Sequence, residues 1–137
     1  MPAVVVDAST VVAALLDNGP DGRWAEQVLT AGHLAAPHLL PVEVASIVRR
    51  AAASRRISPD AAALAHADLQ SLRVELFPYW PFADRIWEMR SNLTCYDAWY
   101  VALAEYLDCP LVTLDGRLAT APGLKCAIQL PDRLGLD

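Results

Sequence analysis

A short apolar run near the N-terminus, followed at once by an acid and then by an apolar helix-like stretch, most constrains the fold of this chain. Residues 4–6 are all valine, without polar alternation, as in a strand buried on both faces of a parallel sheet. The run ends at Asp7, and the apolar residues 11–16 follow. In open α/β sheets, ligands bind outside the carboxyl ends of the strands. Asp7 is therefore either the cap of a helix or one corner of a site.

The rest of the chain alternates between strand-like and helix-like segments. The clearest helix start is Ser58, with Pro59 at the first helical position and Asp60 in the first turn. Such alternation predicts a parallel sheet covered on both faces, so we expect a three-layer α/β/α fold with a short parallel sheet, in one domain over residues 1–137. The expected strands are 4–6, 34–36, 74–77, 110–114 and 126–128, and the expected helices are 9–16, 23–31, 42–54, 59–72, 82–90, 94–107 and 116–121.

Composition narrows the class of protein. The chain is 55% hydrophobic and 20% charged, as in a globular protein, and no apolar run approaches the roughly 20 residues that span a bilayer. No basic segment precedes an apolar one at the N-terminus, so we expect a cytoplasmic protein. Cys95, Cys109 and Cys126 form no CxxC pair, which predicts buried free thiols in place of a disulfide framework or zinc site. The histidines, also without paired spacing, are expected in capping or surface roles.

The charge balance bears on nucleic-acid binding. A net charge of −5 argues mildly against general attraction to nucleic acid, although acids gathered in a metal site would dominate that total. Of the 11 basic residues, all but Lys125 are arginine. The planar guanidinium of arginine binds phosphate through two hydrogen bonds, which lysine does not do. A local basic stripe thus remains compatible with the negative total.

Four acids lie where chemistry is expected, and each also has an ordinary structural explanation. Asp7 fits a helix cap, Glu43 a first helical turn, Asp97 a capping-box spacing after its threonine, and Asp115 a turn with the following glycine. Each explanation suffices for its residue alone.

Taken together, the four acids predict a metal site. Asp7 and Asp115 end apolar strands, and Glu43 and Asp97 open helices, so all four can project from one edge of a parallel sheet. Two carboxylates about 4 Å apart repel by roughly 4 kcal/mol at an effective dielectric near 20, so converging acids need a cation or a shared proton. Oxygen-rich sites suit Mg²⁺ or Mn²⁺, which activates water for hydrolysis of a phosphodiester.

Three segments resemble the PIN domain, and specifically the VapC-type toxins of bacterial toxin–antitoxin pairs: VVVDASTVVA, PHLLPVEVASIVRR and TCYDAWYVALAEYLDCPLVTLDGRLA. The resemblance implies a PIN-like fold and a metal-dependent endoribonuclease with Mg²⁺ or Mn²⁺, held by Asp7, Asp97 and Asp115. It also implies an antitoxin that blocks the site and a toxin homodimer. The acidic cluster would be Asp7, Glu43, Asp97 and Asp115, with the hydroxyls of Ser9 and Thr113 lining it.

Basic and aromatic residues supply a candidate RNA surface. Arg49, Arg50, Arg55 and Arg56 gather at the end of one expected helix, either as a solvated helix end or as a phosphate-binding stripe. Further arginines at 85, 90 and 117 would extend such a stripe. The four tryptophans, at 24, 80, 87 and 99, are expected in the core or at an interface, with base stacking as the alternative.

Two other functions stay open at this point. A receiver-like signalling domain also places acids at strand ends, but Asp7 has no acidic neighbour before Asp17, and Lys125 is poorly placed for that chemistry. A binding module would keep the fold and use the arginines on RNA without cleavage. The apolar face of Val11, Val12, Leu15 and Leu16, with Trp24 and Val28, forms either core or a groove for a partner helix.

Overall fold

The fold is built on one parallel sheet whose central strand is the N-terminal valine run. The computed structural model describes residues 2–132. Its sheet has five strands in the order β3-β2-β1-β4-β5, and every neighbouring pair is parallel. The expected α/β/α class is therefore confirmed. The strands are β1 (Ala3–Val6), β2 (His33–Pro37), β3 (Val74–Phe77), β4 (Leu111–Val112) and β5 (Ile128–Gln129).

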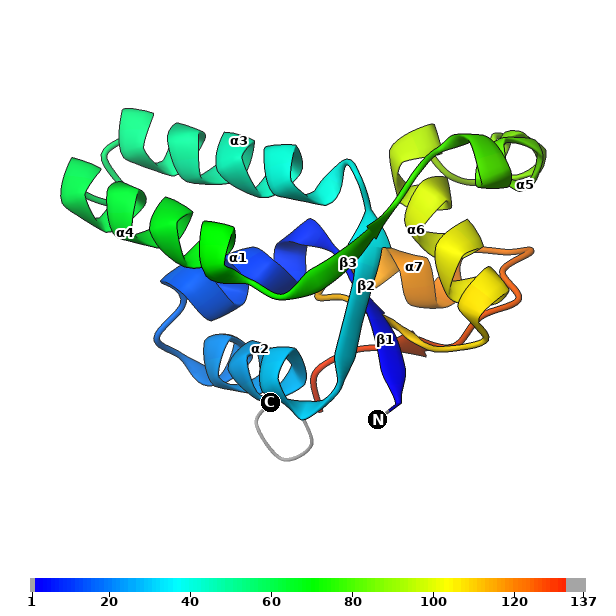
Figure 1. Cartoon of the computed structure of the whole chain (residues 1–137), viewed down its shortest axis with the longest axis horizontal. Coiled ribbons are helices and arrows are strands. Elements are labelled where there is room, and N and C mark those ends of the chain that lie inside the picture. Colours follow the sequence, from blue (N-terminus) through cyan, green and yellow to red (C-terminus); the bar gives the residue numbers. More distant parts are fainter. Residues whose placement is uncertain (1, 133–137) are drawn as a thin grey trace.

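Helices cover both faces of the sheet. Parallel strands joined by right-handed crossovers place helices on opposite faces when the direction of strand progression reverses. Figure 1 shows this division: α1 to α4 lie on one side of the central strands, and α5 and α6 on the other. The helices are α1 (Ala8–Leu16), α2 (Pro20–Ala31), α3 (Leu40–Ala53), α4 (Pro59–Ser71), the 3₁₀ turn η1 (Trp80–Phe82), α5 (Ala83–Glu88), α6 (Cys95–Leu107) and α7 (Arg117–Thr120).

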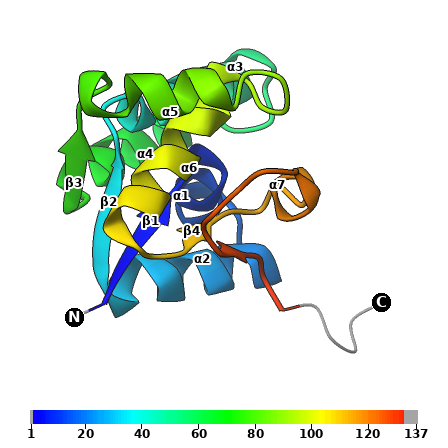
Figure 2. The same cartoon turned by 90° about the vertical axis from the view of Figure 1, so that its right-hand side faces the viewer.

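The reversal creates the place where a site is expected. The chain runs from β1 to β2 and β3 on one side, then crosses to β4 on the other side of β1. Val5 pairs with both Ala35 of β2 and Leu111 of β4. The carboxyl ends of β1 and β4 thus flank the topological switch point, where crevices form in sheets of this kind. Figure 2 shows β1, β4 and α6 meeting in this region.

Helix signals in the sequence were largely correct. Ser58 caps α4 by accepting from the Ala61 N–H at 3.0 Å, and Thr94 caps α6 by accepting from the Asp97 N–H at 3.1 Å. Helix α2 begins at Pro20, three residues before the expected start, because proline fits the first helical position. Strand β4 is shorter than expected, so Asp115 does not end it directly; two residues intervene.

Several smaller expectations are also settled. Within residues 2–132, no helix is long and apolar enough to cross a membrane. Cys109 and Cys126 are half-buried free thiols, but Cys95 is exposed, because it opens α6 on the solvent side, so its expected burial was wrong. The histidines are exposed, as expected. Trp24 and Trp99 pack on the core, whereas the η1 and α5 tryptophans are exposed.

One ion pair ties α5 and α6 to the loop before β5. Arg85 donates from Nε and Nη2 to the two Glu105 carboxylate oxygens at 2.7 and 3.0 Å. Glu105 also accepts from the Lys125 N–H at 2.7 Å. Burial alone would raise the pKa of Glu105, but these donors outweigh it and lower that pKa below its ordinary 4.5. The pair therefore stabilises the folded state where Glu105 is ionised.

We expect Glu105→Gln to lower the free energy of unfolding at pH 7 by about 2 kcal/mol, since bonds to a charged group are lost. A depressed folded pKa contributes stability above the unfolded value and loses it as pH falls through the folded value. The deficit of the variant should therefore shrink below pH 4.5. Denaturant unfolding across pH tests this. Glu88→Gln is the control: the exposed Glu88 also meets Arg85, at 3.3 Å, and should contribute under about 1 kcal/mol. A constant deficit at every pH would contradict the prediction.

Candidate active site

Asp7 follows β1 and is the most enclosed of the candidate acids. Its Oδ1 accepts from the Ser9 hydroxyl at 2.7 Å and from the Thr10 N–H at 3.2 Å, so it is indeed the cap of α1. Its Oδ2 accepts from the Thr113 hydroxyl at 2.5 Å. Burial raises the pKa of Asp7, and the hydroxyl and N–H donors offset part of that rise. Asp7 is thus both a helix cap and a buried carboxylate held from several sides.

Two hydroxyl side chains join the ends of β1 and β4. Thr113 is fully buried, and its Oγ1 accepts from the Asp115 N–H at 2.9 Å while its O–H serves Asp7. Ser9 Oγ accepts from the Leu114 N–H at 3.0 Å. The positions of Asp7 and Asp115 are therefore coupled through the hydroxyls of Ser9 and Thr113.

Glu43 approaches from the first turn of α3. Its Oε1 accepts from the Tyr100 hydroxyl at 2.6 Å, and Tyr100 is buried in α6. Burial raises the pKa of Glu43, the Tyr100 bond opposes that rise, and the carboxylates of Asp7 and Asp97 raise it further. Glu43 therefore lies within electrostatic reach of two other candidate acids.

Asp97 lies in the first turn of α6. The Thr94 hydroxyl oxygen accepts from the Asp97 N–H. Asp97 therefore takes part in the helix cap through its backbone amide. Burial raises the pKa of its carboxyl, Asp115 and Asp7 add to the rise, and the guanidinium of Arg117 opposes it. Asp97 is thus coupled to acids on both neighbouring strand ends.

Asp115 is paired with a cation from its own loop. Arg117 donates from Nε to Oδ1 at 3.0 Å and from Nη2 to Oδ2 at 2.7 Å, and its N–H also reaches Oδ1 at 3.0 Å. Hydrogen bonding to Arg117 lowers the pKa of Asp115 despite partial burial. The Arg117 side chain is 85% exposed, so its ion pair with Asp115 is weakened by solvent. Asp97, Asp115 and Arg117 line one pocket of ≈ 260 Å³.

We call these four acids the acid row: Glu43 is electrostatically coupled to Asp7 and Asp97, and Asp97 is coupled in turn to Asp115, which lines a different pocket from Glu43. Their donor atoms are all oxygens, which suits Mg²⁺ or Mn²⁺, and three of the four have raised pKa values. In the observed rotamers, no three His, Cys, Asp or Glu side chains among residues 2–132 converge closely enough to enclose an ion. The reason is local: Asp7 is directed to hydroxyls and Asp115 to Arg117. The residue types fit a hard cation, and the rotamers shown pair them with protein donors.

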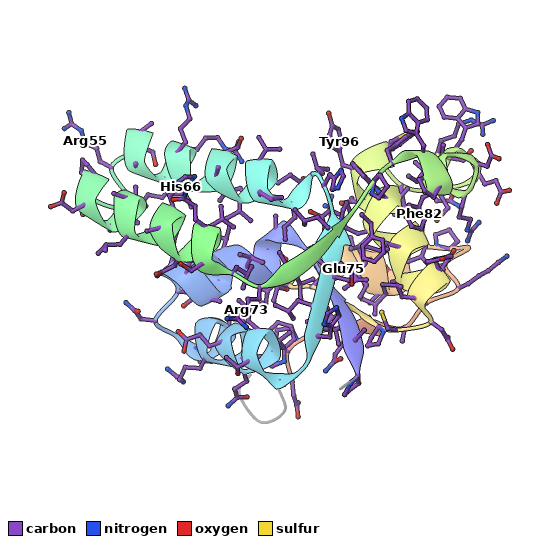
Figure 3. All side chains as sticks on the ribbon, in the orientation of Figure 1. Arg55, His66, Arg73, Glu75, Phe82 and Tyr96 are labelled. Atoms are coloured by element: carbon purple, nitrogen blue, oxygen red, sulfur yellow. The ribbon has the colours of Figure 1, made fainter. Side chains whose placement is uncertain are left out.

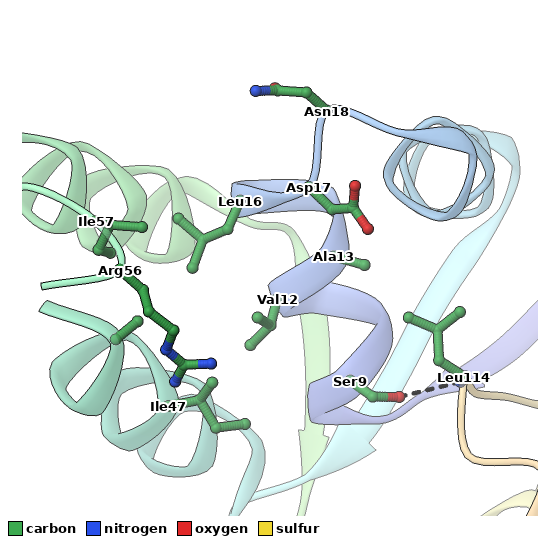
Figure 4. Close-up of a pocket in the computed structure, with 11 residues that line it drawn as sticks. Ser9, Val12, Ala13, Leu16, Asp17, Asn18, Ile47, Arg56, Ile57 and Leu114 are labelled. Carbon is green, nitrogen blue, oxygen red and sulfur yellow. Dashed lines mark hydrogen bonds between the residues drawn. The ribbon is translucent and has the colours of Figure 1, made fainter. Parts of the chain in front are cut away.

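The expected arginine stripe divides into two parts. Arg50 lines a pocket together with Glu43, and Arg56 lines an apolar pocket of ≈ 580 Å³ that reaches Ser9. Figure 4 shows Arg56 extending between side chains of α1 and α3 in that pocket. All four arginines are exposed, and Figure 3 shows Arg55 at the far end of α3, away from the first turn of α6. The structure therefore places Arg50 and Arg56 nearer to the acids than Arg55.

Sequence reasoning missed two polar residues of the site and gave a third, Arg117, another role. Thr10 is fully buried, with its hydroxyl 3.3 Å from Asp7 and 3.1 Å from the Val112 carbonyl. Tyr100 orients Glu43, and Arg117 pairs with Asp115 instead of extending a surface stripe. The spacing of Tyr100, three residues after Asp97 on one helix, was a usable signal.

Fold and site together define an α/β protein with an oxygen-rich acidic centre at the switch point of a parallel sheet. The family model for the PIN domain matches residues 4–124. The chain is 44% identical over 131 residues to Ribonuclease VapC1 of Mycobacterium tuberculosis, covering 95% of this chain and 98% of that protein. The chain therefore belongs to the PIN-domain family, among its VapC ribonucleases.

Solved structures agree on the fold. PAE2754 from Pyrobaculum aerophilum superposes with a TM-score of 0.71 and 25% identity, over 94% of this chain and 84% of that one. VapBC2 from Rickettsia felis, solved bound to a DNA fragment from its promoter, gives a TM-score of 0.67 at 13% identity, over 95% of this chain and 99% of that chain.

Proposed function

We propose that this protein is an endoribonuclease toxin that hydrolyses RNA phosphodiester bonds with Mg²⁺ or Mn²⁺ bound by Asp7, Asp97 and Asp115. The observation that carries the proposal is the row of oxygen-only side chains at the switch point, in which Glu43 and Asp97 have pKa values raised partly by neighbouring carboxylates. Such an excess of negative charge suits a bound cation. The relatives named as VapC ribonucleases support RNA as the substrate.

The chain's own residues have separable roles in this reaction. When bound, the metal supplies a water of lowered pKa and neutralises charge on the phosphoryl oxygens. Asp7 is held in one orientation by hydroxyls on both of its oxygens. Glu43, oriented by Tyr100, is the candidate general base that accepts the proton of the attacking water. Arg50 and Arg56 are the candidate phosphate contacts, and Arg49 and Arg55 extend them along exposed surface.

We also propose that a cognate antitoxin neutralises the toxin. The apolar pocket reaching Ser9 is lined by Val12, Leu16 and Ile47, and it opens between α1 and α3 beside the acids. An apolar helix of a partner fits such a groove. Val11, by contrast, is fully buried core. A homodimer is a further part of the proposal, for which the exposed tryptophans of η1 and α5 offer apolar surface.

The deciding experiment is cleavage of a mixed RNA pool by purified, antitoxin-free protein with Mg²⁺, with Mn²⁺ and with EDTA. Discrete fragments that require a metal support the proposal. Metal-independent binding of intact RNA by well-folded protein would instead indicate the RNA-binding module, and stable phosphorylation of an aspartate by a small phosphodonor would indicate a receiver-like domain. The exposed Asp68 supplies the control variant, Asp68→Asn, which should cleave like the wild type.

Arg117 gives a prediction about metal affinity. Because its guanidinium occupies both Asp115 oxygens, it competes with a cation for the same acid. We expect Arg117→Gln to bind Mn²⁺ more tightly, by about fivefold at most, since an exposed ion pair is weak. Calorimetric titration without RNA measures this. Arg73→Gln removes the same charge from an exposed position at the start of β3 and should leave affinity unchanged. Equal tightening in both variants would show a net-charge effect only.

A further inference from the structure

A second pocket adjoins the acid row at its Glu43 end, and the chemistry above uses Glu43 and Arg50 of its lining but leaves Ser46 and Tyr96 without a role. It has a volume of ≈ 380 Å³, within the range of small-molecule sites, and lies between α3 and the first turn of α6. Its polar lining is Glu43, Ser46 and Arg50 from α3 and Tyr96 from α6. The pocket therefore combines a catalytic candidate, a hydroxyl, a guanidinium and an aromatic ring.

The α3 side of this pocket follows from helical spacing. Ser46, Ile47 and Arg50 follow Glu43 by three, four and seven residues, so all four lie along one stripe of the helix. Ser46 offers a donor and an acceptor, and Arg50 offers a planar fork that matches phosphate. Glu43 lies at the site end of the stripe, and Arg50 lies two turns further away.

Tyr96 forms the opposite wall. It directly precedes Asp97, and its side chain is 63% exposed although it is large and partly apolar. In Figure 3 it projects from the start of α6 into solvent. Its neighbour on the same helix, Tyr100, is by contrast buried and bonded to Glu43. An exposed ring one residue from a candidate metal ligand is well placed to contact a substrate.

We propose that this pocket is a nucleobase subsite in which Tyr96 stacks on the base next to the scissile phosphate, Ser46 hydrogen-bonds to the base edge, and Arg50 binds a backbone phosphate. The inference rests on the proposed ribonuclease function and assigns the side chains that hold the base beside the cut. A base offers its face to a tyrosine only when it is unpaired, so the subsite takes single-stranded RNA.

The pockets at the two ends of the acid row define a path for the RNA strand. The Tyr96 pocket lies at the Glu43 end, and the pocket lined by Asn92, Thr94 and Arg117 lies at the Asp115 end. Asp97 lines the second of these pockets and the preceding residue, Tyr96, lines the first, so the two pockets adjoin at the first turn of α6. An RNA strand that passes from one pocket to the other runs over the acid row. Nucleotides on both sides of the cut therefore contribute to binding.

The test uses full-length protein carrying Asp7→Asn, so that RNA is bound without being cut. Fluorescence anisotropy measures its affinity for a mixed-sequence single-stranded RNA and for the same RNA as a duplex. Adding Tyr96→Ala should weaken single-strand binding about tenfold, the effect of losing one stacked base, and Tyr96→Phe should restore it. The control is Tyr106→Ala, a more exposed tyrosine of the same helix, which should bind RNA like the parent. In the cleaving protein, Tyr96→Ala should raise KM and leave kcat unchanged.

Each outcome separates this inference from the proposed function. Undiminished single-strand affinity in Tyr96→Ala, or no RNA binding by the parent, overturns the subsite. A change of mass in light scattering on Tyr96→Ala would show that a second copy of the chain covers the ring, and would overturn it too. Tyr96-dependent RNA binding without cleavage by the wild type under either metal would support the subsite and contradict the nuclease.

Discussion

Asp7→Asn is expected to fold normally and to lose RNA cleavage by on the order of 1000-fold or more. A divalent cation contributes several kcal/mol to stabilising charge in the transition state, and each 1.4 kcal/mol is a factor of ten in rate. Asn keeps the N-cap, because its side-chain oxygen accepts from the Thr10 N–H as Asp7 does. It removes the negative charge that a hard cation requires. Cleavage rates with saturating RNA and Mn²⁺ measure the loss.

The same substitution should leave stability equal or higher at neutral pH. Burial raises the pKa of Asp7 above its ordinary 3.8, so the folded state holds this proton more tightly than the unfolded state does. Stability then falls as pH rises through the folded value, and the cost is complete above it. Asn carries no such cost, so any advantage of the variant appears at pH 7 and vanishes toward pH 3.8. Denaturant unfolding in EDTA at several pH values measures this.

Two controls make the result decisive. Asp68→Asn makes the same chemical change on the exposed face of α4 and should alter neither rate nor stability. Added Mn²⁺ should raise the Tm of the wild type and of Asp68→Asn, because a ligand that binds only the folded state stabilises it. It should not do so for Asp7→Asn. If Asp7→Asn failed to fold, the prediction would be contradicted and Asp7 would serve only as a helix cap.

The sequence predicted the placement of the acids better than their partners. The valine run followed by Asp7, and the capping signals at Ser58 and Thr94, depend on local chemistry within a few residues, and all three held. Parallel pairing then follows from the strand–helix alternation. Local signals thus sufficed to bring β1 and α6 toward one edge of a sheet.

The contacts between distant residues were harder to predict. Thr113 lies 106 residues from Asp7, and Tyr100 lies 57 residues from Glu43, so no local pattern shows that either pair is bonded. The early end of β4 was missed because residues 111–114 form an apolar run whose threonine itself favours strands. The hydroxyl of Thr113 is instead used by Asp7 and by the Asp115 N–H. Tertiary hydrogen bonding therefore overrode local preference at the site itself.

Thr113→Val tests that coupling, and we expect losses in both stability and activity. Valine has nearly the same shape, but it leaves the Asp115 N–H without its acceptor and Asp7 without its shortest donor. An unsatisfied buried group costs about 1–3 kcal/mol, so the free energy of unfolding should fall by about 2 kcal/mol. Residues that orient metal ligands typically contribute 10- to 100-fold in affinity or activity, and we expect a loss of roughly that size.

A fold defect and a positioning defect are separable in this variant. Thr113→Ser keeps the hydroxyl and should recover most of the activity, although it leaves a small void where the methyl group packed. Thr30→Val on the exposed side of α2 is the control and should change stability by under about 0.5 kcal/mol. For Thr113→Val, the Mn²⁺ concentration giving half-maximal cleavage should rise, measured well below its Tm. If the variant were less stable but kept wild-type metal dependence and rate, Thr113 would serve the fold alone. A rise that the serine variant reverses would show that one buried hydroxyl aligns the carboxylates of two strands.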